Sequence, residues 1–169
     1  ERPVISASNI HYEIADKTQA IAAGGIGLMQ QLVKRVGLDD AINERLQLLK
    51  LYLPYTESDH VLNIAYNLLT GGTCLEHLEL RRNDENYLSA LGAQRIPDPT
   101  TAGDFCRRFN KTAIGQLMDV FNETRKKVWR QQPVEFFEEA IVEADGTLVE
   151  TTSECKQGID INYKGQWGY

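Results

Sequence analysis

The segment Ala140–Thr147, which reads Ala-Ile-Val-Glu-Ala-Asp-Gly-Thr, constrains the fold more than any other part of the chain. A short apolar run leads into an acidic residue and a small-residue turn, a pattern typical of a strand that carries a carboxylate at its end. Residues Phe136–Val149 have the strongest strand signal in the sequence, and Ile159–Tyr169 alternates as a second strand. We therefore expect a β-sheet to begin after Pro133.

The residues that precede Pro133 have helical rather than strand spacing. Apolar side chains recur every three or four positions, and most of these segments are flanked by residues that favour helix termini. Residues Val4–Ile14 are the exception, because they alternate and favour one short strand. Helices are predicted from Gly24–Gly27 to Gly37, over Leu38–Leu49, from a Thr56 or Ser58 cap to Leu69, from a Thr73–Glu76 capping box to Leu80, from a Thr101–Asp104 capping box to Phe109, and through Ile114–Val128.

These patterns predict an α+β fold. A mostly helical module is expected over residues 1–132, and residues 133–169 are expected to begin a sheet domain. Two strands without the rest of their sheet leave unpaired edges, so we also predict aggregation or local disorder after Pro133.

Two consecutive predicted helices, separated by Gly71-Gly72, have two interpretations. The first helix is expected to bury Val61, Leu62, Ala65, Leu68 and Leu69. Because the second helix ends in Arg81-Arg82, the pair resembles a helix-turn-helix unit. A simple αα-hairpin is the favoured interpretation, since the second helix is short and carries Glu76 and Glu79 where a DNA-reading helix needs a basic face.

Charge is distributed unevenly along the chain, whose net charge is −6. From Thr100 to Gln132 there are seven Lys or Arg residues and three acids, whereas Pro133 to Glu154 has seven acids and no Lys or Arg. A basic helix before an acidic strand fits a phosphate-binding arm beside a metal site, and it equally fits a solvated helix face followed by an acidic edge. The candidate phosphate-binding residues are Arg107, Arg108, Lys111, Arg125, Lys126, Lys127 and Arg130.

Cysteine usage and hydropathy favour an intracellular, cytoplasmic location. The chain has three cysteines, Cys74, Cys106 and Cys155, which are far apart in the sequence. An odd number of widely spaced cysteines fits reduced thiols better than a disulfide framework. No apolar leader opens the chain, and runs such as Ala140–Val142 are far too short to span a bilayer. We expect neither secretion nor a membrane partner.

Glu143 and Asp145 are the candidate metal-binding residues. On a strand their side chains point to the same face, because side chains alternate with a period of two. Two carboxylates on one face repel each other unless a cation lies between them, and oxygen ligands favour Mg²⁺ or Mn²⁺ over zinc. We assign Asp145 as the metal ligand and Glu143 as a supporting residue; an edge strand whose acids face water is the alternative.

Several motifs occur in the order and spacing of a known enzyme family. Residues Glu143–Thr147, the polar loop Glu150–Gly158 and the segment Tyr163–Tyr169 resemble the opening of the catalytic core in bacterial insertion-sequence DDE transposases. Upstream, Ser58–Glu76 and Ile96–Phe109 are similar to the helical region of the same enzymes. The resemblance covers most of the chain from about Ile14 onward.

This resemblance implies a ribonuclease H-like α/β core that cuts and joins DNA ends with Mg²⁺ held by Asp, Asp and Glu. Asp145 matches the first Asp, as catalytic residue and metal ligand, and Thr147 matches a small hydroxyl residue that orients the end of the strand. The second Asp and the Glu have no counterpart in these 169 residues, so we expect an N-terminal part of the enzyme that does not bind the metal tightly by itself. The implied partners are the terminal inverted repeats of the transposon and target DNA. Whether the intact protein forms a homo-oligomer is left open by the resemblance.

Two other interpretations remain open. The chain also fits a non-catalytic DNA-binding or oligomerisation module from a decayed element. It also fits an unrelated α+β protein whose acidic strand is incidental.

Overall fold

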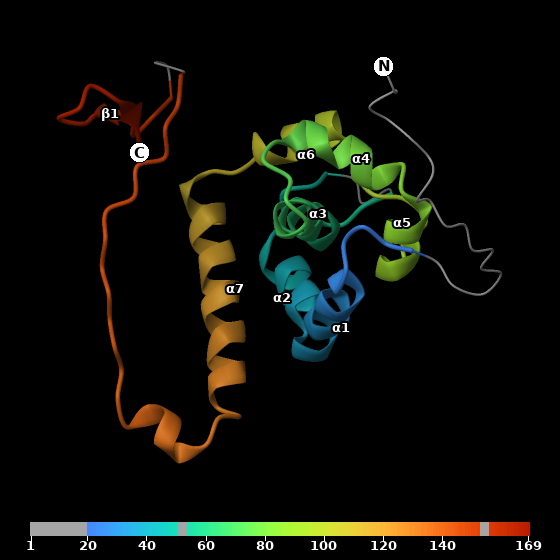
Figure 1. Ribbon diagram of the computed structural model, residues 1–169, viewed down its shortest axis with the longest axis horizontal. Helices are drawn as coiled ribbons and strands as arrows, with labels where there is room; N and C mark the ends of the chain where they lie inside the picture. The colour runs from blue at the N-terminus through green and yellow to red at the C-terminus, as the bar shows by residue number, and fades with distance from the viewer. Residues whose placement is uncertain (1–19, 51–53, 153–155) are drawn as a thin grey trace, which may run out of the picture. The chain divides into compact units, whose positions relative to one another are not determined.

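The computed structural model describes residues 20–50, 54–152 and 156–169, and it contains seven α-helices and a two-stranded sheet within those ranges (Figure 1). The fold is thus mostly helical, with a small β component, within the α+β class. Contacts divide the chain into two compact units, Glu1–Gln131 and Gln132–Tyr169, and each is considered by itself below. The predicted strand Val4–Ile14 lies outside the described residues.

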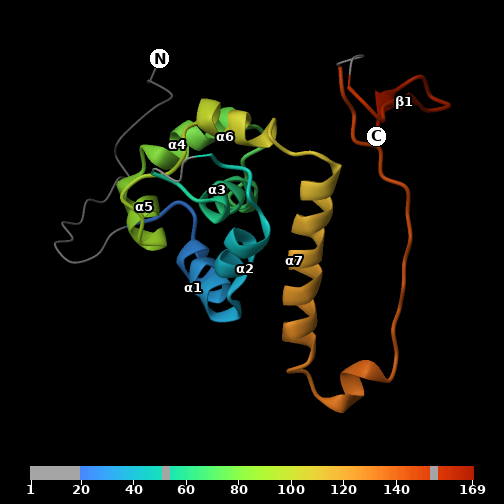
Figure 2. The ribbon, with the colours of Figure 1, turned by 180° about the vertical axis from the view of Figure 1, so that it is seen from behind.

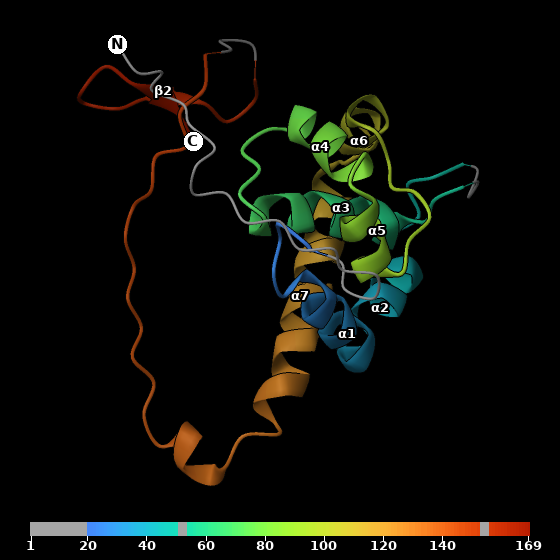
Figure 3. The same cartoon turned by 45° about the vertical axis from the view of Figure 1, so that its right-hand side comes forward.

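All seven helices belong to the first unit. They differ in length from five residues in α4 to 19 residues in α7. Figure 2 shows α1 and α2 side by side, and Figure 3 shows α7 beside them; α2 packs against both helices. The helices are α1 (Ile26–Val36), α2 (Leu38–Arg45), α3 (Glu57–Leu69), α4 (Leu78–Arg82), α5 (Glu85–Leu91), α6 (Pro99–Cys106) and α7 (Lys111–Trp129).

Glycines set both ends of α1. Gly25 precedes the helix with φ at 85°, and Gly37 follows it with φ at 68°. Both values lie in the left-handed region, which costs glycine little and other residues more, because glycine has no Cβ. The prediction of a helix between the glycine run and Gly37 is confirmed. The next helix, α2, is shorter than predicted and ends at Arg45 rather than Leu49.

The start of α3 is confirmed, and its predicted buried face is correct in part, because Val61 and Leu62 are half-buried and pack against the two apolar clusters of the interior. Thr56 and Asp59 form a capping box in which the Asp59 carboxylate accepts the backbone N–H of Thr56 at 2.8 Å. Leu68 and Leu69 are 60% and 61% exposed. The helix instead buries its polar side chains His60, Asn63 and Asn67, because hydrogen bonds to carbonyls of neighbouring segments or aromatic contacts hold them in the interior.

Two other predicted helix starts are wrong. A short 3-10 helix begins after Cys74, and the backbone N–H of Thr73 donates to the His77 ring, so the Thr73–Glu76 capping box does not form. Helix α6 begins three residues earlier than a Thr101 cap would allow. Asp98 caps it by accepting the Thr101 backbone N–H at 2.9 Å, and Pro99 occupies the first turn, where the missing N–H costs nothing.

Two apolar clusters form the interior of the first unit. Helices α1, α3 and α5 enclose the first, and α2 with α7 encloses the second. Tyr66 and Tyr87 are the largest side chains of the first cluster, and burial raises the pKa of each phenol to about 12. The second cluster contains Ile42, Leu46, Ala113 and Val120, so the long helix α7 is held along one face only.

In the second unit, the predicted strand Phe136–Val149 is not formed. A short 3-10 helix occupies Val134–Phe137, and residues 138–149 have no regular secondary structure. Ile141 and Val142 are 82% and 86% exposed, so the apolar run is not part of a core. An extended segment becomes a strand only when a neighbour accepts its backbone N–H groups, and residues 140–148 have no such neighbour among the described residues.

The predicted second strand, Ile159–Tyr169, is a hairpin. Strands β1 (Asp160–Ile161) and β2 (Trp167–Gly168) pair antiparallel around the turn that contains Gly165. On its other side β2 meets Glu150, and the backbone groups of Val149 and Tyr169 exchange hydrogen bonds of 3.1 and 3.2 Å. The small sheet therefore has β2 in its centre.

Candidate functional site

Asp145, the predicted metal ligand, lies in the exposed segment of the second unit that has no regular structure. Its Oδ1 accepts the backbone N–H of Gly146 at 2.8 Å, a local turn contact. Glu143 and Thr147 are exposed as well. Because no strand forms, alternation does not place Glu143 and Asp145 on one sheet face, and that part of the prediction is wrong.

The described residues do not fit a magnesium ion. A stable site needs several oxygen ligands around one point. Among the residues that the structure describes, no group of three His, Cys, Asp or Glu side chains lies close enough to hold a metal. Asp145 therefore does not belong to a group of three potential metal ligands among these residues.

The register of the small sheet shows what pairing Asp145 would require. Glu150 lies opposite Gly168, and in an antiparallel pair each step back along one strand matches one step forward along the other. Asp145 would lie opposite the fifth position after Gly168, whereas the pairing among the described residues reaches only Val149 and Tyr169. The carboxylate thus lies beyond the paired part of the sheet.

The predicted phosphate-binding residues around the α6–α7 turn are already engaged in part. Arg107 pairs with the Asp104 carboxylate one turn earlier, and Arg108 donates to the backbone carbonyl of Leu48 at 3.2 Å. Lys111 is exposed in the first turn of α7. These contacts tie Arg107 and Arg108 to the protein, so Lys111 is the least constrained cation of this group.

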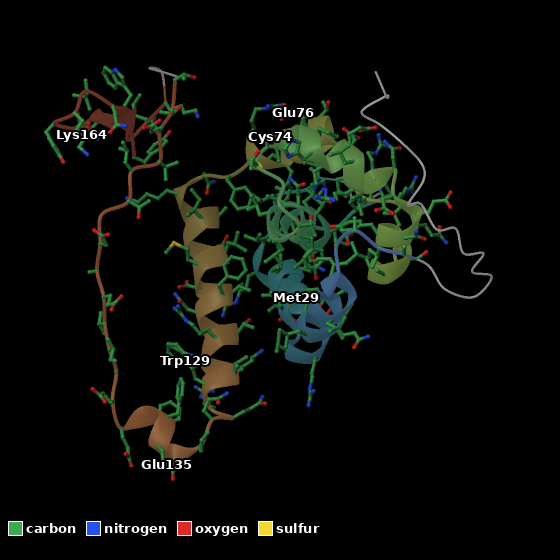
Figure 4. All side chains as sticks on the ribbon, in the orientation of Figure 1. Met29, Cys74, Glu76, Trp129, Glu135 and Lys164 are labelled. Atoms are coloured by element: carbon green, nitrogen blue, oxygen red, sulfur yellow. The ribbon has the colours of Figure 1, made fainter. Side chains whose placement is uncertain are left out.

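The cations at the carboxyl end of α7 are more available. Lys126, Lys127 and Arg130 are exposed, and none of them forms an ion pair with a carboxylate within the described ranges. The Arg125 guanidinium donates to the Asn122 side chain and lies 5.2 Å from the centre of the Trp129 ring, which is labelled in Figure 4. Cations in this position also stabilise the helix dipole, whatever else they bind.

These cations do not form one flat basic face. Successive residues of an α-helix point about 100° apart, so Arg125, Lys126 and Lys127 face three directions. Lys126 and Arg130 are four residues apart and share a side. The carboxyl end of α7 is therefore positive on several sides rather than basic along its whole length.

The sequence patterns missed the buried polar side chains of the first unit. Glu57, His60, Asn63 and Asn67 are each at most 4% exposed, and Asp39 is 6% exposed. Hydrophobic periodicity contains no signal for them, because it assumes that polar residues face solvent. Polar side chains are costly to bury unless they are hydrogen-bonded, so these residues are candidates for a structural or binding role.

His60 is the most unusual member of that group. Its ring stacks on Phe105 at 4.4 Å and meets Tyr55 edge-on at 5.7 Å, while its Nδ1 has no hydrogen-bond partner within the described structure. Burial lowers the pKa of the imidazole, and the nearby Arg108 lowers it further against the opposing effect of Asp59 and Glu57. His60 is thus a neutral aromatic side chain of the core.

No helix in the described ranges has the length and apolar character that crossing a bilayer requires. Neither the known family models, nor the curated proteins, nor the solved structures include a match to this chain.

Proposed function

We propose that this chain is the N-terminal part of a DDE transposase, and that its helical unit binds DNA. The order and spacing of the motifs from Ser58 to Tyr169 support the family assignment. The observation that carries the DNA-binding proposal is the exposed group of cations at the carboxyl end of α7, which has no carboxylate partner among the described residues. Phosphate contacts supply most of the sequence-independent affinity of proteins for DNA.

The proposed chemistry of the intact enzyme is the cutting and joining of transposon ends by metal-dependent phosphoryl transfer. Asp145 is its proposed first ligand for Mg²⁺ or Mn²⁺. For residues 1–169 we propose DNA binding alone, since the described side chains do not complete a metal site. Arg125, Lys126, Lys127 and Arg130 are the proposed contacts to phosphate, with Lys111 as an additional contact.

A second candidate function is oligomerisation, and one observation favours it. Ile114, Met118, Phe121 and Val128 are 50%, 59%, 44% and 38% exposed on the side of α7 that α2 leaves uncovered. Their spacing of four, three and seven residues matches the a and d positions of a heptad pattern. In this interpretation α7 pairs with another helix, and the cations at its carboxyl end only stabilise the helix dipole.

Charge reversal at Lys126 and Lys127 tests the primary proposal. Phosphate contacts are independent of sequence, so a mixed-sequence duplex of about 30 base pairs is a sufficient probe. Each lost phosphate contact lowers the slope of log affinity against log salt by about one, so the double variant Lys126→Glu/Lys127→Glu is expected to lose about two in slope and to bind more weakly at every salt concentration.

The matched control is the double variant Lys156→Glu/Lys164→Glu, which changes net charge equally in the second unit. It is expected to keep most of the slope. Equal losses in both double variants would indicate a general charge effect, and an unchanged slope in the α7 variant would reject the assignment of these contacts. A sedimentation experiment with Phe121→Glu addresses the second candidate, because it dissociates any assembly that depends on the apolar side of α7.

A further inference from the structure

Trp129, the last residue of α7, is an exposed aromatic side chain among cations. The indole is 42% exposed, although tryptophan is highly buried on average in folded proteins. Figure 4 labels it near the carboxyl end of the helix. A large ring that lies open to water at this place favours a ligand that presents a flat apolar surface.

The Arg125 guanidinium restrains the indole. Its central carbon, Cζ, lies 5.2 Å from the centre of the ring, within the range of a cation–π contact. The same guanidinium donates to the Asn122 side chain, one turn earlier in α7. Because Arg125 is tied to Asn122 on one side and to the ring on the other, the indole loses little conformational freedom when a ligand stacks on it.

The cations around the ring supply the charge that a nucleic acid strand requires. Residues three positions apart are neighbours on a helix surface, so Lys126 lies beside Trp129, and Arg130 follows the ring directly. Glu123, the last acidic residue of α7, pairs with Arg45 of α2 at 2.9 Å rather than with a cation of its own helix. The surroundings of the indole are therefore complementary to phosphate.

The form of DNA that suits this arrangement is a single strand. In a duplex, each base is stacked between its neighbours, so its faces are closed to a protein side chain. An unpaired strand presents open base faces beside its phosphates. Proteins that bind single strands combine cations for the backbone with aromatic side chains on which bases stack. An exposed, restrained ring among cations has both features.

We propose that the carboxyl end of α7 binds single-stranded DNA, with one base stacked on the Trp129 indole and the adjoining phosphates bound by Lys126 and Arg130. This inference rests on the proposed DNA binding of the helical unit, and it specifies the form of DNA that the helix end takes. The cations bind phosphates of either form, whereas the ring distinguishes unpaired bases from paired ones.

Tryptophan fluorescence tests the stacking directly, because the chain has two tryptophans. The variant Trp167→Phe leaves Trp129 as the sole emitter. The matched control is Trp129→Phe, which leaves Trp167, a tryptophan of the second unit that is 44% exposed. The probe is an oligothymidylate of about 12 nucleotides, within the range of single-strand site sizes. We expect it to quench the emission of the first variant and not that of the second.

An abasic oligomer of the same length separates stacking from charge. It keeps the phosphates and lacks the bases, so we expect it to bind the Trp167→Phe variant more weakly and without quenching. Equal quenching by the abasic oligomer and the oligothymidylate would show that the fluorescence reports charge alone, and it would overturn the inference.

Affinities for the two forms of DNA separate this inference from the proposed function. Trp129→Leu, which places a good helix former at an exposed position, is expected to weaken oligothymidylate binding at least about fivefold and mixed-sequence duplex binding less than about twofold. Duplex binding that Lys126→Glu/Lys127→Glu weakens, with oligothymidylate binding that Trp129→Leu leaves unchanged, overturns the inference alone. Absence of binding to both probes overturns the inference together with the proposed function.

Discussion

Glu57, in the first turn of α3, accepts the backbone N–H of Leu48 at 3.0 Å through its Oε1 atom. The same oxygen accepts the N–H of Leu49 at 3.1 Å, and the side chain is fully buried. One carboxylate thus satisfies two backbone donors of the segment that follows α2. Hydrogen bonds to a charged acceptor are worth about 1.5–3 kcal/mol, so this contact ties the segment that follows α2 firmly to α3.

Removing the Glu57 carboxylate should destabilise the first unit. Glu57→Ala removes the acceptor of the N–H groups of Leu48 and Leu49, which are half-buried, and we expect a loss of about 2–4 kcal/mol in the free energy of unfolding. Glu57→Gln keeps an acceptor at the same place and should cost at least 1 kcal/mol less. Urea denaturation followed by circular dichroism measures both; equal losses would mean that the carboxylate contributes through charge or packing alone.

Two glycines of the first unit should respond oppositely to alanine. A Cβ on Gly72 would overlap Asn67 Oδ1, and the Asn67 side chain is buried and donates to the Cys74 carbonyl at 2.9 Å. Gly72→Ala therefore has to displace Asn67, at a cost of about 1–3 kcal/mol. Gly115 lies inside α7, where a Cβ meets nothing within 4 Å, so Gly115→Ala should stabilise by about 0.5–1 kcal/mol.

The two alanine variants are compared by thermal denaturation. A loss of stability in Gly115→Ala would show that the uncovered side of α7 is more crowded than the structure indicates. An unchanged midpoint in Gly72→Ala would show that Asn67 moves freely.

His60 should make stability depend on pH. Burial lowers its pKa below the ordinary value of 6.5, so the unfolded chain binds the proton more readily than the folded chain. This contribution to stability is complete above about pH 6.5 and is lost as the pH falls through that value towards the lower pKa of the folded state. His60→Gln should flatten the dependence of the unfolding free energy between pH 7.5 and 5.

The matched control for His60 is His77→Gln, which removes a half-buried histidine that accepts only the Thr73 N–H. This variant should keep the wild-type slope. If both histidine variants change the slope equally, the titration of the buried ring is not its origin.

The rate of hydrogen exchange in the second unit should be high before Val149 and lower for the paired amides from Val149 onward. The amides of Val149, Thr151 and Tyr169 donate to backbone carbonyls of the small sheet, whereas Ile141–Leu148 have no such pairing among the described residues. We expect exchange of the latter group at nearly the rate of an unstructured peptide, and slower exchange of the three paired amides. Uniform protection through Asp145 would contradict the structure of this segment.

Some helix termini were predictable because local chemistry determines them. Gly37 and Thr56 mark the ends of α1 and α3 in the sequence and in the structure, since a left-handed backbone and a side-chain acceptor act within a few residues. The start of α6 was misplaced because two acceptable caps, Asp98 and Thr101, compete three residues apart. Pro99, with its fixed φ, favours the earlier one.

Tertiary contacts were not predictable in the same way. Asn63 and Asn67 are buried because the Pro97 and Cys74 carbonyls accept their amide protons, and those partners lie 34 and seven residues away. The segment around Asp145 has the local pattern of a strand but no backbone partner among the described residues, and a strand depends on its neighbour more than on its own residues. A polar pocket lined by Asp39 likewise depends on segments that only the fold brings together.

The salt dependence of DNA binding by the unmodified chain tests the central proposal most directly. Each phosphate contact to duplex DNA contributes about −0.9 to the slope of log affinity against log salt. With the four cations at the carboxyl end of α7 engaged, we predict a slope of about −3 to −4 between 50 and 200 mM salt. A slope near zero, or no binding at 50 mM salt, would contradict the proposal that this helical unit binds DNA.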